Sequence, residues 1–334
     1  MEEMTASFLN SQKLPIVITP KNRKTTFQQF LTDISSQKAA LRKQLSTYGG
    51  ILFRGFPVKD ENDFLEVLKT LGINNFMDYI GGDSPRKKLN AHVYTSTEAP
   101  PSLKIPLHNE LSFVKNYPKY ICFFCVTPAV QGGETILGDA RKVYQTIDPE
   151  IRNKFIAKGI KYTSAYYYKS PLMEFINRMK PSHKSWIQVF ETENKQEVEH
   201  LCRKNEFHLK WLRKDWLQIS QHGSAVQTHP ETKEKVWFNQ AHLYDFNPKL
   251  LGFWPYLGAR LFYLRKAYKL HQVHFKDGTK IPYKDLCHVL DALDANTVAF
   301  PWQEGDVLVL DNILTMHGRA PFSGKRRVLA AMSS

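Results

Sequence analysis

The sequence predicts a mainly β protein, a β barrel or jelly roll of two short-stranded sheets, with a helical N-terminal part and helical insertions. Three observations support this prediction. The composition, 42% hydrophobic, 13% aromatic and 23% charged, is that of a folded chain. After Pro101, short aromatic and β-branched runs follow one another between Gly, Pro and Asp turn signals, as in antiparallel sheets. Helical patterns precede these runs and interrupt them between about residues 140 and 290.

The N-terminal part alternates helix and strand. A helix is expected from about Ser36 to Thr47, followed by the apolar strand Ile51–Phe53. Arg54 to Pro57 interrupt that strand with a glycine and a proline. Glu61–Leu71 then has the apolar spacing of an amphipathic helix.

Short strands and helices share the rest of the chain. The expected strands are Tyr120–Val126, Thr135–Leu137, Ile160–Tyr167, Val236–Asn239, Val307–Leu310 and Arg327–Met332. The expected helices include Pro149–Lys158, Gln196–Lys204 and Ala259–Tyr268. Because no repeat or Gly/Ser linker divides the chain, we expect one domain over residues 1–334. Its expected parts are an N-terminal part (about 1–100), a core (about 101–140 and 225–334) and helical insertions (about 141–224 and 245–295).

Charge and cysteine content limit the partners and the compartment. The 46 Lys and Arg against 32 Asp and Glu give a net charge of +14. The basic residues are spread out and form no long tail, so we expect a solvated basic surface and no nucleic-acid partner. The acidic start is not that of a secretory signal, and no apolar stretch is long enough to cross a membrane. Only four Cys are present, so we expect no disulfide framework and a cytoplasmic protein.

The segment Pro106-Leu-His-Asn-Glu110 contains the first candidate metal ligands. In an extended strand, residues i and i+2 point to the same side, so His108 and Glu110 would offer a nitrogen and a carboxylate oxygen to one point. Taken alone, the pair is equally consistent with a surface strand or turn.

His317 is the third candidate, at the end of a strand-like run from Asp306 to Thr315. A single histidine there is most simply a hydrogen-bonded core residue. Together with His-x-Glu, however, it completes the set of two histidines and one carboxylate that binds ferrous iron on one face and leaves other positions open.

Two arginines and a threonine match the co-substrate of such an iron site. Arg326 and Arg327 lie at the start of an apolar strand. A guanidinium held there can form a bidentate ion pair with a carboxylate. Thr135 follows a Gly-Gly-Glu turn and would add a hydroxyl. A solvated basic turn and an ordinary strand residue are the alternatives for these positions.

The C-x-x-C sequence at Cys122 and Cys125 does not predict a zinc site. Two residues three apart on a strand face opposite ways, and the sequence has no second pair at zinc spacing.

The motifs together resemble a known family. The stretches that carry the resemblance are GGILFRGFPV, VYTSTEAPPSLKIPLHNELSF, PAVQGGETILGDAR, KVWFNQAH and FPWQEGDVLVLDNILTMHGRAPFSGKRRVLAAM, in this order from about residue 49 to the C-terminus. They are similar to the TauD/TfdA superfamily of iron(II)/2-oxoglutarate-dependent oxygenases. The His-x-Glu motif resembles that of the clavaminate-synthase-like branch. The sequences of the motifs are similar to those of the SyrP-like amino-acid hydroxylases.

The resemblance implies a double-stranded β-helix core and a set of roles. His108, Glu110 and His317 fall on the iron-ligand positions and are the implied catalytic residues. Thr135 and Arg326 fall on the positions that hold 2-oxoglutarate, with Arg327 second to Arg326. The position of a further family arginine is Ala330 here. The implied reaction uses Fe(II), 2-oxoglutarate and O2, releases succinate and CO2, and hydroxylates an unactivated C–H; Glu110 argues against a halogenase.

The substrate is the least determined part of this reading. Asn239, and more weakly Tyr94, are candidate substrate-binding residues on matching stretches. The resemblance implies a small-molecule substrate, an amino acid or amino-acid-like compound, either free or tethered to an acidic carrier protein that the basic chain would meet. The insertion from about Pro171 to Gln221 would serve as a lid or partner surface, and an oligomer is compatible with this reading.

Two alternatives remain beside hydroxylation. The same residues would serve desaturation or cyclisation. A non-catalytic binding protein on the same scaffold, with a basic surface for an acidic partner, would be expected to have lost a ligand or the arginine anchor, and this sequence has lost neither.

Overall fold

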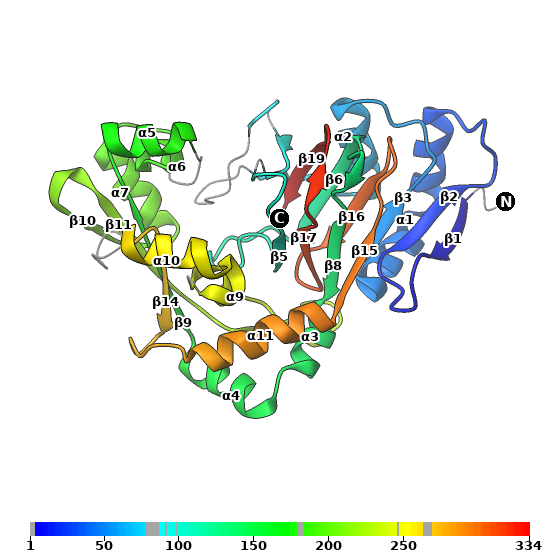
Figure 1. Cartoon of the computed structure of the whole chain (residues 1–334). Coiled ribbons are helices and arrows are strands. Elements are labelled where there is room, and N and C mark those ends of the chain that lie inside the picture. Colours follow the sequence, from blue (N-terminus) through cyan, green and yellow to red (C-terminus); the bar gives the residue numbers. More distant parts are fainter. Residues whose placement is uncertain are drawn as a thin grey trace.

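Two β-sheets and a pair of helices form the part of the molecule that carries the candidate site. A computed structural model describes residues 4–77, 87–90, 92–97, 99–179, 184–245, 247–262 and 269–334. The larger sheet has the strand order β1-β2-β3-β16-β6-β19-β4, and the smaller has β15-β8-β17-β5 (Figure 1). The mainly β fold with a double-stranded β-helix core is therefore confirmed.

The elements have the following bounds. The strands are β1 (Met4–Phe8), β2 (Ile16–Pro20), β3 (Gly50–Phe53), β4 (Tyr94–Thr95), β5 (Ile105–His108), β6 (Tyr120–Thr127), β7 (Gln131–Gly132), β8 (Thr135–Asp139), β9 (Ile160–Tyr166), β10 (His208–Trp211), β11 (Leu217–Gly223), β12 (Val226–Thr228), β13 (Lys235–Trp237), β14 (His271–Phe275), β15 (Thr297–Phe300), β16 (Val307–Asp311), β17 (Thr315–Arg319), β18 (Phe322–Ser323) and β19 (Arg327–Ser333). The helices are α1 (Phe27–Tyr48), α2 (Glu61–Leu71), α3 (Ala140–Thr146), α4 (Pro149–Lys158), α5 (Pro171–Met179), α6 (Trp186–Phe190), α7 (Lys195–Lys204), α8 (Ala241–Tyr244), α9 (Pro248–Leu251), α10 (Phe253–Phe262) and α11 (Tyr283–Ala295).

The central strand β6 is buried on both faces, which explains its nearly continuous apolar sequence. Ile121, Phe123 and Cys125 belong to the core between the two sheets. Cys122 and Phe124 belong to a second core beneath α1 and α2. The two thiols thus lie on opposite faces, as the two-residue period of a strand requires, and burial raises the pKa of each.

Helix α1 is longer than the sequence predicts, beginning at Phe27 and not near Ser36. Thr26 caps it by accepting a hydrogen bond from the Gln29 backbone N–H. Polar residues up to the expected start lie inside the helix, where the hydroxyls of Thr32 and Ser36 bond to carbonyls of the preceding turn. Helices α2 and α4 have the predicted bounds.

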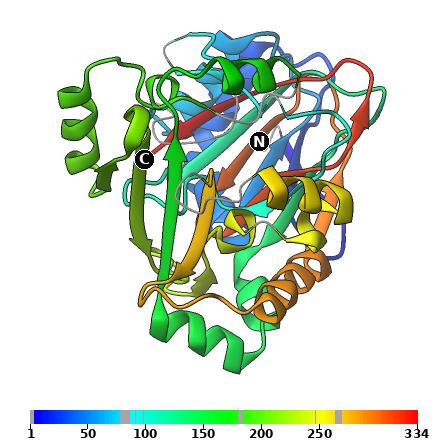
Figure 2. The ribbon, with the colours of Figure 1, turned by 60° about the vertical axis from the view of Figure 1, so that its left-hand side comes forward.

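The region between α3 and α11 combines helices with strands. It contains a further sheet, β10-β11-β9-β14, together with α5, α6 and α7. Figure 1 shows these elements to the left of the core, and Figure 2 shows β9 and β14 side by side. Of the predicted helix Ala259–Tyr268, the first residues are the end of α10, and residues 263–268 lie outside the described part of the chain.

Trp186 belongs to the core of this region. Trp186 is fully buried and packs edge-on against Trp211.

Across the described residues, no helix has both the length and the apolar character that a membrane crossing requires.

We predict that the substitution Phe124→Ala destabilises the protein by about 3–5 kcal/mol, because it opens a cavity between β6 and α2 where the ring stacks on Phe64 at 5.7 Å. Urea or thermal unfolding measures the change. Ile156→Ala on α4, a side chain 45% exposed, is the control, with a change below about 1 kcal/mol. Equal effects of the two substitutions would contradict the two-core arrangement.

Candidate metal centre

The pairing of β5 with β17 brings the two candidate histidines together. His108 lies directly opposite His317 in the ladder, and their ring centroids are 4.5 Å apart. Gly318 allows the close approach, since a Cβ at that position would lie 2.3 Å from the Ile105 carbonyl oxygen. Residues about 200 positions apart in the chain therefore share one face of the smaller sheet.

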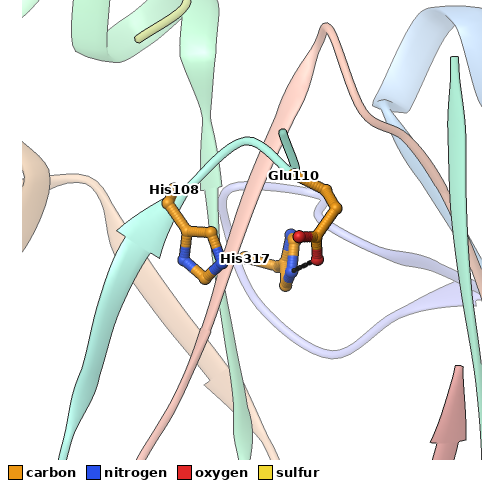
Figure 3. A group of neighbouring side chains, drawn as sticks. All are labelled: His108, Glu110 and His317. Carbon is orange, nitrogen blue, oxygen red and sulfur yellow. Dashed lines mark ion pairs between the residues drawn. The ribbon is translucent and has the colours of Figure 1, made fainter. Parts of the chain in front are cut away.

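Glu110 reaches the same point by a route that differs from the prediction. Strand β5 ends at His108, so the expectation of an extended His-x-Glu segment is wrong. The chain turns, with Leu111 in the left-handed region at φ 51°. The carboxylate oxygen Oε2 of Glu110 then lies 3.6 Å from Nε2 of His317 (Figure 3).

His317 lies in the middle of β17 and not at the end of one long strand. The predicted run is split by a turn after Asp311, whose Oδ1 accepts hydrogen bonds from the backbone N–H groups of Ile313 and Leu314. Nε2 of His229 donates to Oδ2, the other oxygen of this buried carboxylate, at 3.0 Å, because its Nδ1 accepts from the Thr232 N–H. The turn reverses the chain so that β17 runs back through the smaller sheet.

The three side chains fit a metal ion. One donor atom from each of His108, Glu110 and His317 lies within 4.8 Å of the others, and all three residues are buried. Nδ1 of His108 lies 2.9 Å from the Pro106 carbonyl oxygen, so it carries the proton and Nε2 keeps its lone pair. Nδ1 of His317 is buried with no hydrogen-bond partner among the described residues. Two imidazoles and one carboxylate are the donor set that suits ferrous iron.

A buried amide network holds the main chain of the Glu110 turn. Asn312 accepts a hydrogen bond from the Glu110 N–H at 2.7 Å and donates to the Glu110 carbonyl oxygen at 3.0 Å. Asn109 donates in return to the Asn312 carbonyl oxygen at 2.6 Å. Asn312 also donates to the Pro118 carbonyl oxygen at 2.7 Å. The turn between β16 and β17 is therefore hydrogen-bonded directly to the turn that carries Glu110, which we call the ligand turn.

The segment around α8 supports the same turn from another side. Gln240 donates to the Asn109 carbonyl oxygen at 2.6 Å. Nε2 of His242 lies 2.9 Å from the Leu107 carbonyl oxygen. Burial lowers the pKa of His242 to about 4, so this imidazole is neutral and donates at Nε2.

Asn239, the candidate substrate-binding residue, is not among the residues that line the inner cavity described below. The residue is fully buried, its amide donates to the Ala225 carbonyl oxygen at 3.0 Å, and its Oδ1 accepts from the Ala241 N–H at 3.0 Å. Both ends of the amide are therefore engaged by main chain, and Asn239 organises the segment that presents Gln240 and His242.

A small inner cavity connects the histidines with the expected co-substrate residues. Its lining includes His108, His317, Thr135 and Arg326. The Thr135 hydroxyl accepts a hydrogen bond from Nε1 of Trp302 at 3.0 Å, so its own proton is available for another acceptor. Nε of Arg326 donates to the Gly133 carbonyl oxygen at 2.9 Å.

The structure separates the two arginines. Arg326 points into the inner cavity, and burial together with the neighbouring Arg319 lowers its pKa to about 10. Arg327 is exposed, begins β19 and lies outside that lining, whereas Arg326 precedes the strand.

Several cavity residues were missed by the sequence reasoning. Ser96 and Thr97 line the inner cavity just after Tyr94, whose own ring is buried in the core and outside the cavity lining. Arg319 also lines it and donates to the Ala99, Pro100 and Leu103 carbonyl oxygens. The sequence His317-Gly-Arg319, which places an arginine two residues after a candidate ligand, could have indicated Arg319.

Comparisons with known proteins decide the family. The model of the family described as taurine catabolism dioxygenase TauD, TfdA family, matches residues 14–332. This chain belongs to that family. The dapdiamide synthesis protein DdaC of Enterobacter agglomerans is 36% identical over 86% of this chain and 83% of its own length. A clavaminate synthase-like protein of Arabidopsis thaliana is 30% identical over 96% of this chain and 94% of its own.

Solved structures show the same fold. PvcB of Pseudomonas aeruginosa superposes with a TM-score of 0.56 at 13% identity, covering 99% of this chain and 91% of its own. A taurine dioxygenase from Burkholderia xenovorans gives a TM-score of 0.53 at 13% identity, over 99% and 89%. Membership of the TauD/TfdA family confirms the expected enzyme class, a 2-oxoglutarate-dependent dioxygenase that uses iron, 2-oxoglutarate and O2.

We predict that Asn312→Ala weakens metal binding about 10- to 100-fold, because the Glu110 turn loses the two hydrogen bonds that place its carboxylate. Anaerobic titration with Fe(II), or with Mn(II) as a stable substitute, measures the affinity. The variant is also expected to unfold at a lower temperature, since the buried Glu110 N–H and C=O lose their partner.

The control for Asn312 is Asn296→Ala, at the end of α11. Asn296 is also buried, and its amide donates to the Ala292 carbonyl oxygen and the Thr146 hydroxyl. We expect a comparable fall in melting temperature and unchanged metal affinity. Similar metal affinities for the two variants would show that Asn312 does not position Glu110.

Proposed function

We propose that this dioxygenase hydroxylates an unactivated C–H of an amino acid or amino-acid-like small molecule. His108, Glu110 and His317 are the iron ligands in this proposal, and Arg326 and Thr135 hold 2-oxoglutarate. The observation that carries it is one small cavity whose lining includes the two histidines of the candidate metal centre and Arg326. The keto acid group of 2-oxoglutarate would bind at the metal and its distal carboxylate at Arg326.

The described residues supply binding, orientation and exclusion of water. Nη2 of Arg326 has no hydrogen-bond partner among the described residues, and the Thr135 hydroxyl proton is free to point at the same carboxylate. Phe123 packs 5.2 Å from the His317 ring and closes the apolar side of the metal centre. The bound iron supplies the activation of O2.

The reaction balances without a further reductant. One oxygen atom of O2 goes to the C–H carbon, which becomes an alcohol. The other goes to 2-oxoglutarate, which loses its C1 carboxylate as CO2 and becomes succinate. The two electrons that the substrate C–H gives up, and the two from decarboxylation, together reduce O2 by four electrons.

A relative and the charge support the substrate class. The relative DdaC is named for dapdiamide synthesis. The net charge of +14 suits an amino acid delivered on an acidic carrier protein, and we include this mode of delivery in the proposal. The four cysteines are free thiols, which supports a reducing, cytoplasmic compartment.

Other reactions at the same site would give different products. Desaturation or cyclisation would give a product without the added oxygen, which mass spectrometry separates from a hydroxylated one. A non-catalytic binding protein would consume no 2-oxoglutarate, and the intact ligand set and arginine anchor argue against it.

We expect the Fe(II)-loaded protein to develop the visible metal-to-ligand charge-transfer band of a 2-oxoglutarate chelate under anaerobic conditions. His108→Ala should abolish the band by removing a ligand. Arg326→Ala should weaken 2-oxoglutarate binding about 30-fold or more, because a buried charge pair loses one partner. Anaerobic titration followed by absorbance measures both.

Arg327→Ala is the matched control, since Arg327 is the exposed neighbour of Arg326. We expect its equilibrium affinity for 2-oxoglutarate to change less than about threefold. A larger loss in Arg327→Ala than in Arg326→Ala would reverse the assignment. Absence of the band in the wild-type protein would overturn the proposed site.

We expect a carrier-tethered amino acid to be turned over with a higher kcat/KM than the same amino acid in free form, because the carrier adds binding energy remote from the reacting carbon. Succinate release measures both. Equal kcat/KM values for the two forms would contradict delivery on a carrier and leave the hydroxylase assignment untouched.

A further inference from the structure

A second and larger cavity adjoins the inner one on the side of Arg326. Its volume is about 540 Å³, against about 30 Å³ for the inner cavity. We call it the basic vestibule, because its lining includes Lys87, Arg319, Lys325, Arg326 and Arg327 and no Asp or Glu among the described residues.

The two cavities are adjacent and share part of their lining. Arg319 and Arg326 line both of them, together with Ser96, Thr97 and Val328. Arg327 and Lys325 line only the vestibule and are exposed. The cations therefore extend from the solvent to the guanidinium that faces the candidate metal centre.

The inner pair of guanidiniums is held in place by an aromatic ring. The Arg319 and Arg326 guanidinium carbons lie 4.9 Å and 5.7 Å from the centroid of Phe322. Two guanidiniums that line one cavity repel each other, and burial together with the charge of Arg319 lowers the pKa of Arg326. An anion between them would relieve this repulsion.

The outer pair is available for long-range attraction. Lys325 and Arg327 form no ion pair with any described acidic residue, so their charges are not neutralised locally. Exposed like charges at the mouth of a cavity raise the local concentration of an oppositely charged ligand and its association rate by about 10- to 1,000-fold.

We propose that the basic vestibule is the entrance for 2-oxoglutarate, and that Lys325 and Arg327 steer this dianion toward Arg326. The inference rests on the proposed function, in which Arg326 holds the distal carboxylate. In this arrangement the ligand meets the exposed cations first and the half-buried Arg326 last. The exposed pair acts on the association rate, whereas Arg326 acts on the stability of the complex.

The test is stopped-flow absorbance of the charge-transfer band as 2-oxoglutarate is mixed anaerobically with the Fe(II)-loaded protein. We expect the double variant K325E/R327E to lower the association rate constant about tenfold at low ionic strength, with the dissociation rate constant changed less than about threefold. The difference should shrink as salt is added, because screening acts on exposed charges. K325Q/R327Q should give a smaller effect in the same direction.

The matched control is K21E/K24E, which makes the same change in net charge. Lys21 and Lys24 are exposed between β2 and α1, beside the part of the larger sheet farthest from β4 and the vestibule. We expect its association rate constant to remain within about twofold of wild type.

The outcomes separate the two proposals. A normal band with an unaltered association rate in K325E/R327E would overturn the vestibule as the entrance. An equal slowing in K21E/K24E would do the same, because it would attribute the effect to net charge alone. Absence of the band in the wild-type protein would overturn the proposed function and, with it, this inference.

Discussion

The arrangement of the candidate centre depends on one contact, the pairing of β5 with β17. This pairing sets His108 directly opposite His317, and the absence of a Cβ at Gly318 permits the close approach of the two strands. Glu110 lies just beyond the paired strand, so its position depends on the turn that follows. Asn312, in the turn between β16 and β17, binds both main-chain polar groups of Glu110. The element that starts β17 therefore also places the third ligand, and one local arrangement sets the geometry of all three side chains.

The surrounding structure keeps this arrangement rigid. Strand β6 packs on both faces, with the inter-sheet core on one side and the α1 and α2 core on the other. The larger sheet is thus a rigid support for Phe123, which packs against the His317 ring. Gln240 and His242 hold carbonyl groups on either side of His108. Because a buried polar group without a partner costs about 1–3 kcal/mol, the hydrogen bonds to the Leu107, Asn109 and Glu110 carbonyl oxygens favour one conformation of the ligand turn.

The fold was predictable from the sequence wherever a local pattern was strong. The amphipathic spacing of Glu61–Leu71 and the Pro-started segment Pro149–Lys158 gave correct helix bounds. The apolar run of β6 indicated a strand because a doubly buried strand carries apolar residues on both faces. Local signals misled where tertiary structure decides. Ser36 resembled a helix start, yet α1 begins at Phe27, since the inner polar residues bond back to their own helix. Likewise the run from Asp306 to Thr315 contains a turn that depends on Asp311, not one continuous strand.

The sequence by itself determined the chemical types and the family: two histidines, a carboxylate and an arginine in motifs of the TauD/TfdA family. Only the tertiary structure decided which of two adjacent arginines enters the cavity: Arg326, just before β19, is half-buried and bonded to the Gly133 carbonyl oxygen, whereas Arg327, the first residue of β19, is exposed. It also showed that the KVWFNQAH stretch, where Asn239 was expected to read a substrate, supports the ligand turn through Gln240 and His242. Residue type and spacing determine what a side chain can do chemically. Its partners come from strand pairing and packing between distant segments, and no local pattern in the sequence encodes them.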